Sequence, residues 1–261
     1  MPENDVKLPD PAKLVVSSSP HIHQPQNARK IMLTVAAALA PACLAGIYFF
    51  GWRALWVLGW CVLGCVVCEY LSCKVLKRPN ALPDYSAVVT GILLGMNLSA
   101  AAPWWVCLIG AVIAIGLAKQ MYGGLGYNIF NPVLVARVGL IIALPGLMTT
   151  WYKPTPGNLF PEAMTTATPL DYAARGMAET DYLSYFLGNM GGCIGETSAL
   201  ALLVGGAVLV YFGHIRWQVP AAFIGAVAVI TAVVHAVSPE TTPDALFHAL
   251  TGGLMLGAIF M

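Results

Sequence analysis

The chain has 261 residues, of which 58% are hydrophobic and only 10% are charged, and its mean hydropathy is +0.75. Soluble domains carry about 25% charged residues, so the composition indicates an integral membrane protein. The formal net charge of +1, without any basic stripe, gives no argument for a nucleic-acid partner. Residues 1–30 are polar and mixed in charge, so we do not expect them to form a signal peptide.

Eight apolar segments are candidates for membrane-spanning helices. A helix needs about 20 largely apolar residues to cross a bilayer, or slightly fewer where neighbours cover its ends. The segments are 31–50, 54–73, 85–101, 104–121, 131–148, 197–212, 219–237 and 245–261. The sequence therefore predicts an all-α integral membrane protein with about eight transmembrane helices.

Four of the seven cysteines lie in the second apolar segment, and three of them have the spacing Cys61-x3-Cys65-x2-Cys68. This spacing is also that of the iron–sulfur ligands in radical-SAM enzymes. On a helix it places the three thiols on one face, where cysteine behaves as a small hydrophobic residue. We favour that interpretation, and we expect no disulfide framework.

Residues 82–95 and 242–257 share Pro-Asp, Thr-Gly and a further Gly in the same order, and they open the third and eighth segments. These segments run in opposite directions, so the pattern predicts an inverted repeat of five helices; chance agreement of common residue types is the alternative. The expected divisions are a cytoplasmic tail (1–30), a first five-helix repeat (31–148), an extracytoplasmic loop (149–196) and a second, apparently truncated repeat (197–261). A longer natural protein with two further helices is thus expected, with a genuine eight-helix variant ending at Met261 as the alternative.

Basic residues in short loops mark the cytoplasmic side of a membrane protein. With the N-terminus inside, that side collects Lys7, Lys13, Arg29, Lys30, Lys74, Lys77, Arg78, Lys119 and Arg216. The outer side holds Arg53, Lys153 and Arg175. The bias places the N-terminus in the cytoplasm and loop 149–196 outside. Arg137 falls within the fifth segment, where a charge marks either a helix-pairing partner or a functional pocket.

The loop contains the polar stretch Glu162-Ala-Met-Thr-Thr-Ala-Thr168-Pro-Leu170. One interpretation is a turn in which Thr168 caps a short helix that begins at Pro169. The stretch is also similar to the flavin-attachment motif Asp-x-x-(Ser/Thr)-Gly-Ala-Thr, whose last threonine carries FMN through a phosphoester bond. Here Glu162 replaces the Asp and Thr166 replaces the Gly, while the Ala167-Thr168 pair is intact.

The same loop is rich in acidic and aromatic residues. It contains Glu162, Asp171, Glu179, Asp181 and Glu196, together with Trp151, Tyr152, Phe160, Tyr172, Tyr182, Tyr185 and Phe186. The aromatic residues are typical of an interfacial belt, and they also suit the walls of a flavin site.

A glycine-rich block, Gly123-Gly-Leu-Gly-Tyr-Asn-Ile-Phe-Asn-Pro132, separates the fourth and fifth segments. It lacks the spacing and the preceding strand of a dinucleotide-binding fingerprint. Either it is a tight turn, with Asn131 capping the helix that Pro132 begins, or it is a broken segment that lines a site.

Several stretches together resemble the family of the D subunit of the Rnf electron-transport complex, whose close relative is the B subunit of the sodium-pumping NADH:quinone reductase. They are Ser18-Ser-Pro-His-Ile22, Asp84-Tyr-Ser-Ala-Val-Val-Thr-Gly91, Ala118-Lys-Gln120, the block from Gly123 to Pro132, and Met148-Thr-Thr-Trp151. The glycine-rich block is the most specific part of this resemblance.

The resemblance implies a ten-helix inverted-repeat protein of the bacterial inner membrane, in contact with lipid and with the other Rnf subunits. It implies FMN esterified to Thr168, within a motif that includes Thr165, Thr166 and Ala167. A flavin transferase attaches this flavin outside the cytoplasm with FAD as donor, and a second, non-covalent flavin is a further expectation. The complex couples electron flow between ferredoxin and NAD to translocation of Na⁺ or H⁺.

The start of a helix at Pro169 favours a phosphate there. Our hypothesis is that Arg175 or Lys153 adds counter-charge, and the alternative is that these residues simply face solvent. The alternative function is a transporter or channel for a small polar solute without a redox role, since inverted-repeat helical folds are typical of transporters. Flavin fluorescence of the denatured polypeptide separates the two, because only a covalent flavin survives denaturation.

Overall fold

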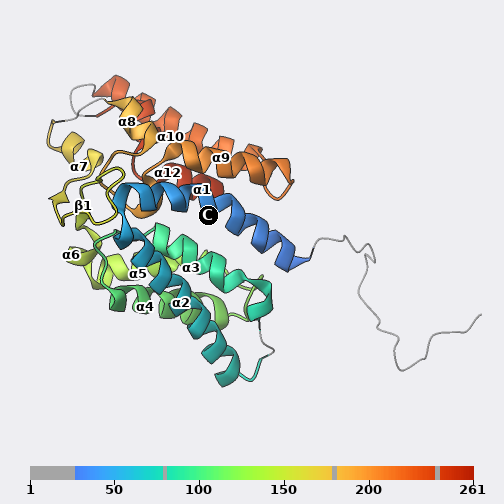
Figure 1. Ribbon diagram of the computed structural model, residues 1–261. Helices are drawn as coiled ribbons and strands as arrows, with labels where there is room; N and C mark the ends of the chain where they lie inside the picture. Colours follow the sequence, from blue (N-terminus) through green and yellow to red (C-terminus); the bar gives the residue numbers. More distant parts are fainter. Residues whose placement is uncertain (1–26, 79–80, 178–180, 239–241) are drawn as a thin grey trace, which may run out of the picture.

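The computed structural model describes residues 27–78, 81–177, 181–238 and 242–261 (Figure 1). Most of the expected N-terminal tail, the stretch 18–22 and Glu179 lie outside the described residues. The described chain is mostly helical. Its elements are α1 (Ala28–Phe50), α2 (Trp52–Val75), η2 (Leu82–Asp84), α3 (Ser86–Met96), α4 (Trp104–Ala111), η3 (Val112–Gln120), α5 (Pro132–Ala143), α6 (Pro145–Met148), β1 (Trp151–Tyr152), β2 (Thr165–Thr166), α7 (Pro169–Ala174), α8 (Tyr182–Leu187), η4 (Ile194–Glu196), α9 (Ala199–Tyr211), α10 (Gln218–Val237), α11 (Ala245–Leu250) and α12 (Leu254–Phe260).

Three of the described helices, α1, α2 and α10, are long and apolar enough to cross a membrane. Four shorter apolar helices accompany them, at Ser86–Met96, Trp104–Gln120, Pro132–Ala143 and Ala199–Tyr211. The helical membrane class predicted from composition is therefore confirmed. The number of crossings and the inverted repeat stay predictions.

Two segments expected to be continuous helices are broken, so that part of the prediction is wrong. Residues 131–148 divide between α5 and α6 at Leu144, which has φ −136° and ψ 56°. A residue before proline is disfavoured in the helical region, and Pro145 follows. Residues 245–261 divide between α11 and α12 at Gly252 and Gly253, whose φ angles of +81° and +73° interrupt a right-handed helix.

The glycine-rich block forms a turn between η3 and α5, which confirms the first of its two interpretations. Gly123, Gly124 and Gly126 all have positive φ. The Asn131 side chain accepts a hydrogen bond of 2.9 Å from the backbone N–H of Val133, so it caps α5 as predicted.

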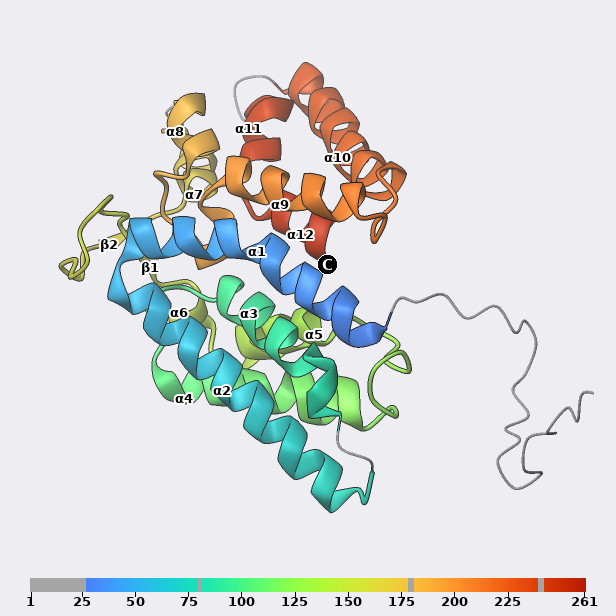
Figure 2. The same ribbon diagram turned by 45° about the vertical axis from the view of Figure 1, so that its right-hand side comes forward.

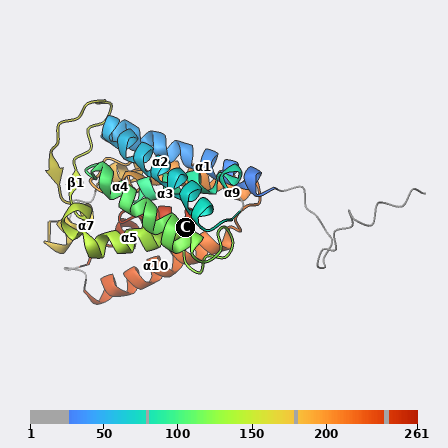
Figure 3. The ribbon, with the colours of Figure 1, turned by 90° about the horizontal axis from the view of Figure 1, so that it is seen from below.

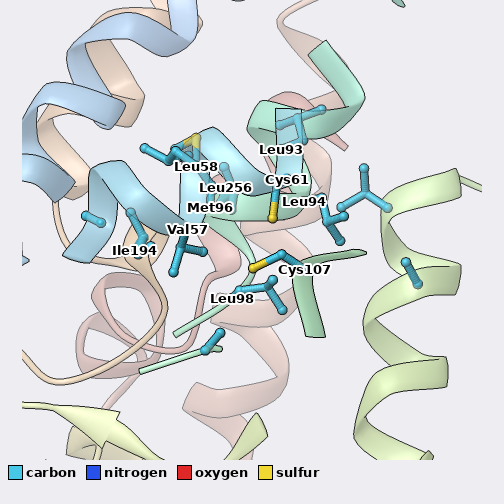
Figure 4. Close-up of a cluster of buried hydrophobic side chains, with 14 of the residues drawn as sticks. Val57, Leu58, Cys61, Leu93, Leu94, Met96, Leu98, Cys107, Ile194 and Leu256 are labelled. Atoms are coloured by element: carbon cyan, nitrogen blue, oxygen red, sulfur yellow. The ribbon is translucent and has the colours of Figure 1, made fainter. Parts of the chain in front are cut away.

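The helices form two groups with α1 between them (Figure 2). Helices α2 to α5 and η3 pack together on one side of α1, and α9 to α12 lie on the other. The main apolar core draws side chains from both groups, and Figure 4 shows Cys61 of α2 and Cys107 of α4 pointing toward one another within it. All seven cysteines are free thiols, and Cys61 and Cys65 are buried in this core as small apolar residues.

The threonine-rich loop is attached to the turn between α1 and α2, at one end of the bundle (Figure 3). Gly51 makes this turn with φ +62°. The backbone N–H of Thr155 donates to the carbonyl of Phe49 at 2.9 Å, and that of Trp52 donates to the carbonyl of Leu159 at 2.9 Å. Membrane helices therefore fix the position of the loop that carries Thr168.

Candidate functional site

Thr168 lies just after a short antiparallel strand pair, in which each strand has two residues, that the sequence did not indicate. Strands β1 and β2 pair antiparallel, with Trp151 opposite Thr166 and Tyr152 opposite Thr165. Thr168 then begins α7 as its N-cap, and its Oγ1 accepts a hydrogen bond of 3.2 Å from the backbone N–H of Asp171. The predicted capping role is confirmed. The hairpin and the cap together hold the threonine hydroxyl at a fixed place in the loop.

Two adjoining cavities flank Thr168. The first, here the tyrosine cavity, has a volume of about 430 Å³ and is lined by Lys153, Pro154, Thr166, Ala167, Pro169, Tyr172, Met177, Tyr185, Asn189, Met190 and Gly191. The second, here the arginine cavity, has about 310 Å³ and is lined by Arg137, Thr149, Trp151, Thr168, Pro169, Leu170, Asp171, Met190, Gly191, Glu196 and Gly252. They share Pro169, Met190 and Gly191.

The wall common to both cavities depends on a glycine. A Cβ added to Gly191 would lie 2.4 Å from Cγ2 of Thr166 and 3.2 Å from the carbonyl oxygen of Ala167. Real Cβ atoms do not approach other atoms so closely. Only glycine lets this segment run directly against the threonine motif.

Arg137 projects from α5 into a network of three other polar residues. Its Nη1 donates to Oδ1 of Asn97 at 2.8 Å and to the Asn97 carbonyl at 3.3 Å. Its Nη2 pairs with Oε1 of Glu196 at 3.4 Å, and Oε2 of Glu196 accepts from the backbone N–H of Cys193 at 3.3 Å. The sequence left open whether Arg137 pairs helices or lines a pocket, and the structure shows both.

The other predicted cations and aromatic residues divide between the cavities. Lys153, Tyr172 and Tyr185 line the tyrosine cavity, and Trp151 lines the arginine cavity. Arg175 lies at the C-terminal end of α7, is exposed, and is absent from the lining of both. Thr165 is likewise exposed in β2 and contributes to neither lining.

The loop helices are joined to the second helix group by polar contacts. The Tyr182 hydroxyl at the start of α8 donates to Oδ1 of Asp244 at 2.9 Å, and this hydrogen bond raises the pKa of Tyr182. Asp181 accepts from the hydroxyl of Ser184 at 2.6 Å, which lowers the pKa of the Asp181 carboxyl. These contacts fix α8, which carries Tyr185 of the tyrosine cavity.

A buried ion pair lies among the helices of the first group. Lys119 Nζ is 2.8 Å from both carboxylate oxygens of Glu69 and 2.7 Å from the Ser86 hydroxyl, and Gln120 donates to the same carboxylate at 3.1 Å. The Lys119 and Glu69 side chains are 2% and 0% exposed. Lys119 belongs to η3, a π-helix, a rare form that is frequent at functional sites.

This pair was not predicted from the sequence. Lys119 was counted among the cations of the cytoplasmic side, which stays a prediction, and the structure places its side chain inside the helices and not in a solvent-exposed loop. The sequence did contain a signal for the pair, because Glu69 and Lys119 are opposite charges that each lie inside a run predicted to span the membrane. Within the described ranges, no group of three or more His, Cys, Asp or Glu side chains is placed to hold a metal ion.

These features define a multi-pass helical membrane protein with a polar, threonine-bearing loop over one end of its helices. Residues 15–261 match the model of the NQR2, RnfD, RnfE family, and the chain belongs to that family. It is 43% identical over 253 residues to the D subunit of the Na⁺-translocating ferredoxin:NAD⁺ oxidoreductase complex of Acetobacterium woodii, covering 95% of this chain and 76% of that relative.

Two further relatives are similar over most of the chain. The D subunit of the proton-translocating ferredoxin:NAD⁺ oxidoreductase complex of Clostridium ljungdahlii is 39% identical over 259 residues, covering 94% of this chain and 77% of the relative. The D subunit of the ion-translocating oxidoreductase complex of Stutzerimonas stutzeri is 36% identical over 262 residues, covering 89% and 74%. The first two relatives thus carry names with different ions.

Proposed function

We propose that this chain is a membrane flavoprotein subunit of an ion-translocating ferredoxin:NAD oxidoreductase complex. It passes electrons between ferredoxin and NAD(H) through FMN bound covalently to Thr168, coupled to movement of Na⁺ or H⁺. Family membership and the names of the similar subunits support the complex. The observation that carries the flavin assignment is the placement of Thr168, with a half-buried side chain, on a cavity wall at the end of a motif held by β2 and α7.

The two cavities suit a flavin mononucleotide. Small-molecule sites have volumes of about 300–1,000 Å³, and the adjoining cavities of about 430 and 310 Å³ lie in this range, with linings that mix polar and apolar groups. The tyrosine cavity is lined by Tyr172 and Tyr185, which suit an aromatic ring system, and by Asn189, which suits its polar edge. The arginine cavity has a cation, Arg137, in the same lining as Thr168.

Attachment needs one nucleophilic hydroxyl that a transferase can reach. Thr168 Oγ forms a bond to the phosphorus of the FMN half of FAD, and the bond from that phosphorus to the bridging oxygen breaks. AMP leaves with the bridging oxygen, and the hydroxyl proton passes to a base of the transferase. The Oγ lone pairs remain able to accept the N–H of Asp171, so the cap of α7 survives the modification. Bound FMN supplies one- and two-electron transfer.

Residues of this chain orient the flavin ring and influence its potential. Tyr172 and Tyr185 order an aromatic ring in the tyrosine cavity, while Lys153 places a positive charge at the same cavity. A fixed positive charge close to a flavin favours its reduced, more negative forms and so raises its potential. Flavin transferase and the other subunits of the complex are the expected partners, and a second, non-covalent flavin remains part of the proposal.

The Glu69–Lys119 pair places two charged side chains within the helices, where a role in ion translocation can be proposed for them. Removing two charges from water is costly unless they are paired and hydrogen-bonded, and ionisable residues within membrane segments are usually functional. We place the ion-coupling function of this subunit at the Glu69–Lys119 pair, with the N-terminus in the cytoplasm and the Thr168 loop outside.

The decisive experiment is mass spectrometry of the proteolytic peptide that contains Thr168, after co-expression with a flavin transferase. The proposal expects a mass increase equal to FMN minus water on Thr168 and yellow fluorescence of the denatured polypeptide. An unmodified peptide with a non-fluorescent polypeptide would exclude covalent flavin and favour a transporter without a redox role.

A further inference from the structure

We infer that Arg137 is the residue that binds the phosphoryl group esterified to Thr168 and so positions the flavin. The inference rests on the proposed attachment of FMN to Thr168. It concerns the side chain from α5, which the sequence did not connect with the threonine motif. Arg137 and Thr168 are 31 positions apart in the chain and line the same cavity of about 310 Å³.

Charge distinguishes Arg137 from the other candidates. It is the cation among the residues that line the arginine cavity, where Thr168 also lies. Lys153 lines the tyrosine cavity beside Thr166 and Ala167, and Arg175 lines neither. A phosphodiester carries one negative charge. A planar guanidinium binds phosphate oxygens through paired N–H donors more specifically than an ammonium group does.

The guanidinium is held in place by Asn97 and Glu196. Asn97 receives two contacts from Nη1 and Glu196 one from Nη2, while the side chain keeps 26% of its surface exposed. A guanidinium has five N–H donors, more than these contacts require. A head group fixed by neighbouring hydrogen bonds needs little reordering when a ligand arrives.

Two carboxylates also line the arginine cavity and must be accounted for. Glu196 is engaged by Arg137 and by the backbone N–H of Cys193, so part of its charge is compensated within the protein. Asp171 is exposed to solvent, where water and salt screen its charge. Neither carboxylate therefore outweighs the electrostatic attraction between Arg137 and a phosphate in this cavity.

The test uses the full chain co-expressed with a flavin transferase and extracted in mild detergent. The variants are Arg137→Met, Arg137→Lys and the double variant Arg137→Met/Glu196→Gln, with Arg175→Met as a matched control. The readouts are flavin fluorescence per polypeptide on a denaturing gel, the initial rate of attachment, and the fluorescence anisotropy of the attached flavin in the folded protein.

Arg137→Met is expected to slow attachment about tenfold, the loss of one charge-assisted contact, and to lower the anisotropy of the remaining flavin. Arg137→Lys should retain part of both, and Arg175→Met should match the wild type. The double variant removes the Glu196 charge that Arg137→Met leaves unpaired. It should restore folding yet keep the slow attachment.

Two results would overturn the inference. One is a normal rate and anisotropy in Arg137→Met, and the other is full recovery of both in the double variant, which would assign Arg137 a structural role only. A wild-type polypeptide without covalent flavin is a different outcome, because it removes the proposed function and the inference with it.

Discussion

The loop of residues 149–196, which carries Thr168, and the Glu69–Lys119 pair lie at opposite ends of helix α3. They differ in how far their polar groups are exposed to solvent. At the start of α3 the Ser86 hydroxyl accepts from Lys119, and just after its end Asn97 binds Arg137. A helix of 11 residues is about 16 Å long, so the two sites are close but separate. The ion pair is almost completely buried, whereas Thr168 and Arg137 keep access to solvent.

The proposed function asks different things of these two sites. If FMN is attached to Thr168 as proposed, the site must accept a bulky group from another enzyme, which needs an open wall and a fixed hydroxyl. A buried pair excludes water and fully satisfies its charges, so any ion or proton that reaches it has to exchange with groups already bound there. The predictions below test whether the two sites differ in these respects.

The largest expected effect is at Thr168. Thr168→Ala should abolish the covalent flavin completely while the protein stays in the membrane, because losing one helix cap costs only about 1 kcal/mol. In-gel flavin fluorescence and the amount of membrane-inserted protein are the measurements. Thr165→Ala and Thr166→Ala serve as controls and should retain flavin. Flavin that persists in Thr168→Ala and disappears in Thr166→Ala would move the attachment site.

The two ends of α2 should report opposite sides of the membrane. Helix α2 has 24 residues and is about 36 Å long, enough to cross the roughly 30 Å hydrocarbon layer. A reporter fused near Gly157, which is hydrogen-bonded to the α1 end beside this helix, should be active only outside. A reporter near Lys77, beyond the other end, should be active only in the cytoplasm. The reverse pattern would contradict both the orientation and the attachment of flavin outside.

The sequence could predict local features such as helix caps, and it missed the long-range contacts of both sites. Thr168 and Asn131 were assigned as helix caps because a cap depends on the next two or three residues and on a following proline. Arg137 was recognised as marking either a helix-pairing partner or a functional pocket, but its partners could not be named, since Asn97 and Glu196 are 40 and 59 positions away.

The ion pair and the hairpin were missed for a related reason. Glu69 and Lys119 are 50 positions apart, and while Lys119 was counted as a cytoplasmic cation, Glu69 lies in an apolar run and was not considered as its partner. Strands of two residues carry no periodic pattern, so the pairing of β1 with β2 gives no signal in the sequence. Pro145 and the Gly252-Gly253 pair could have predicted the two helix breaks. The segments were instead predicted as continuous helices because of their apolar composition.

The next largest effect should come from breaking the buried pair. Lys119→Met leaves the Glu69 carboxylate buried without its cation, and the free energy of unfolding should fall by about 3–5 kcal/mol. The double variant Lys119→Met/Glu69→Gln removes both charges and should recover much of this loss. Unfolding in mixed detergent micelles measures these differences, with the exposed Lys74→Met as control. Equal losses in the single and double variants would show that the two side chains are not energetically coupled.

The smallest effect expected is at Gly191, and it tests how closely the loop must fit around the motif. Gly191→Ala would put a Cβ 2.4 Å from Cγ2 of Thr166, in backbone whose φ is not itself restrictive. The segment from Met190 must then move away from Thr166 and Ala167, at a cost of about 1–3 kcal/mol for an overpacked contact. Because this segment is the wall shared by both cavities, the rate of flavin attachment should fall several-fold while the polypeptide stays inserted. The matched control is Gly146→Ala in α6, where no atom lies within 4 Å of an added Cβ, so stability and attachment should be unchanged or slightly improved. Equal stability and equal attachment rates in the two variants would mean that the segment at Gly191 can move without cost. The β-hairpin and the α7 cap would then hold the motif without support from this segment.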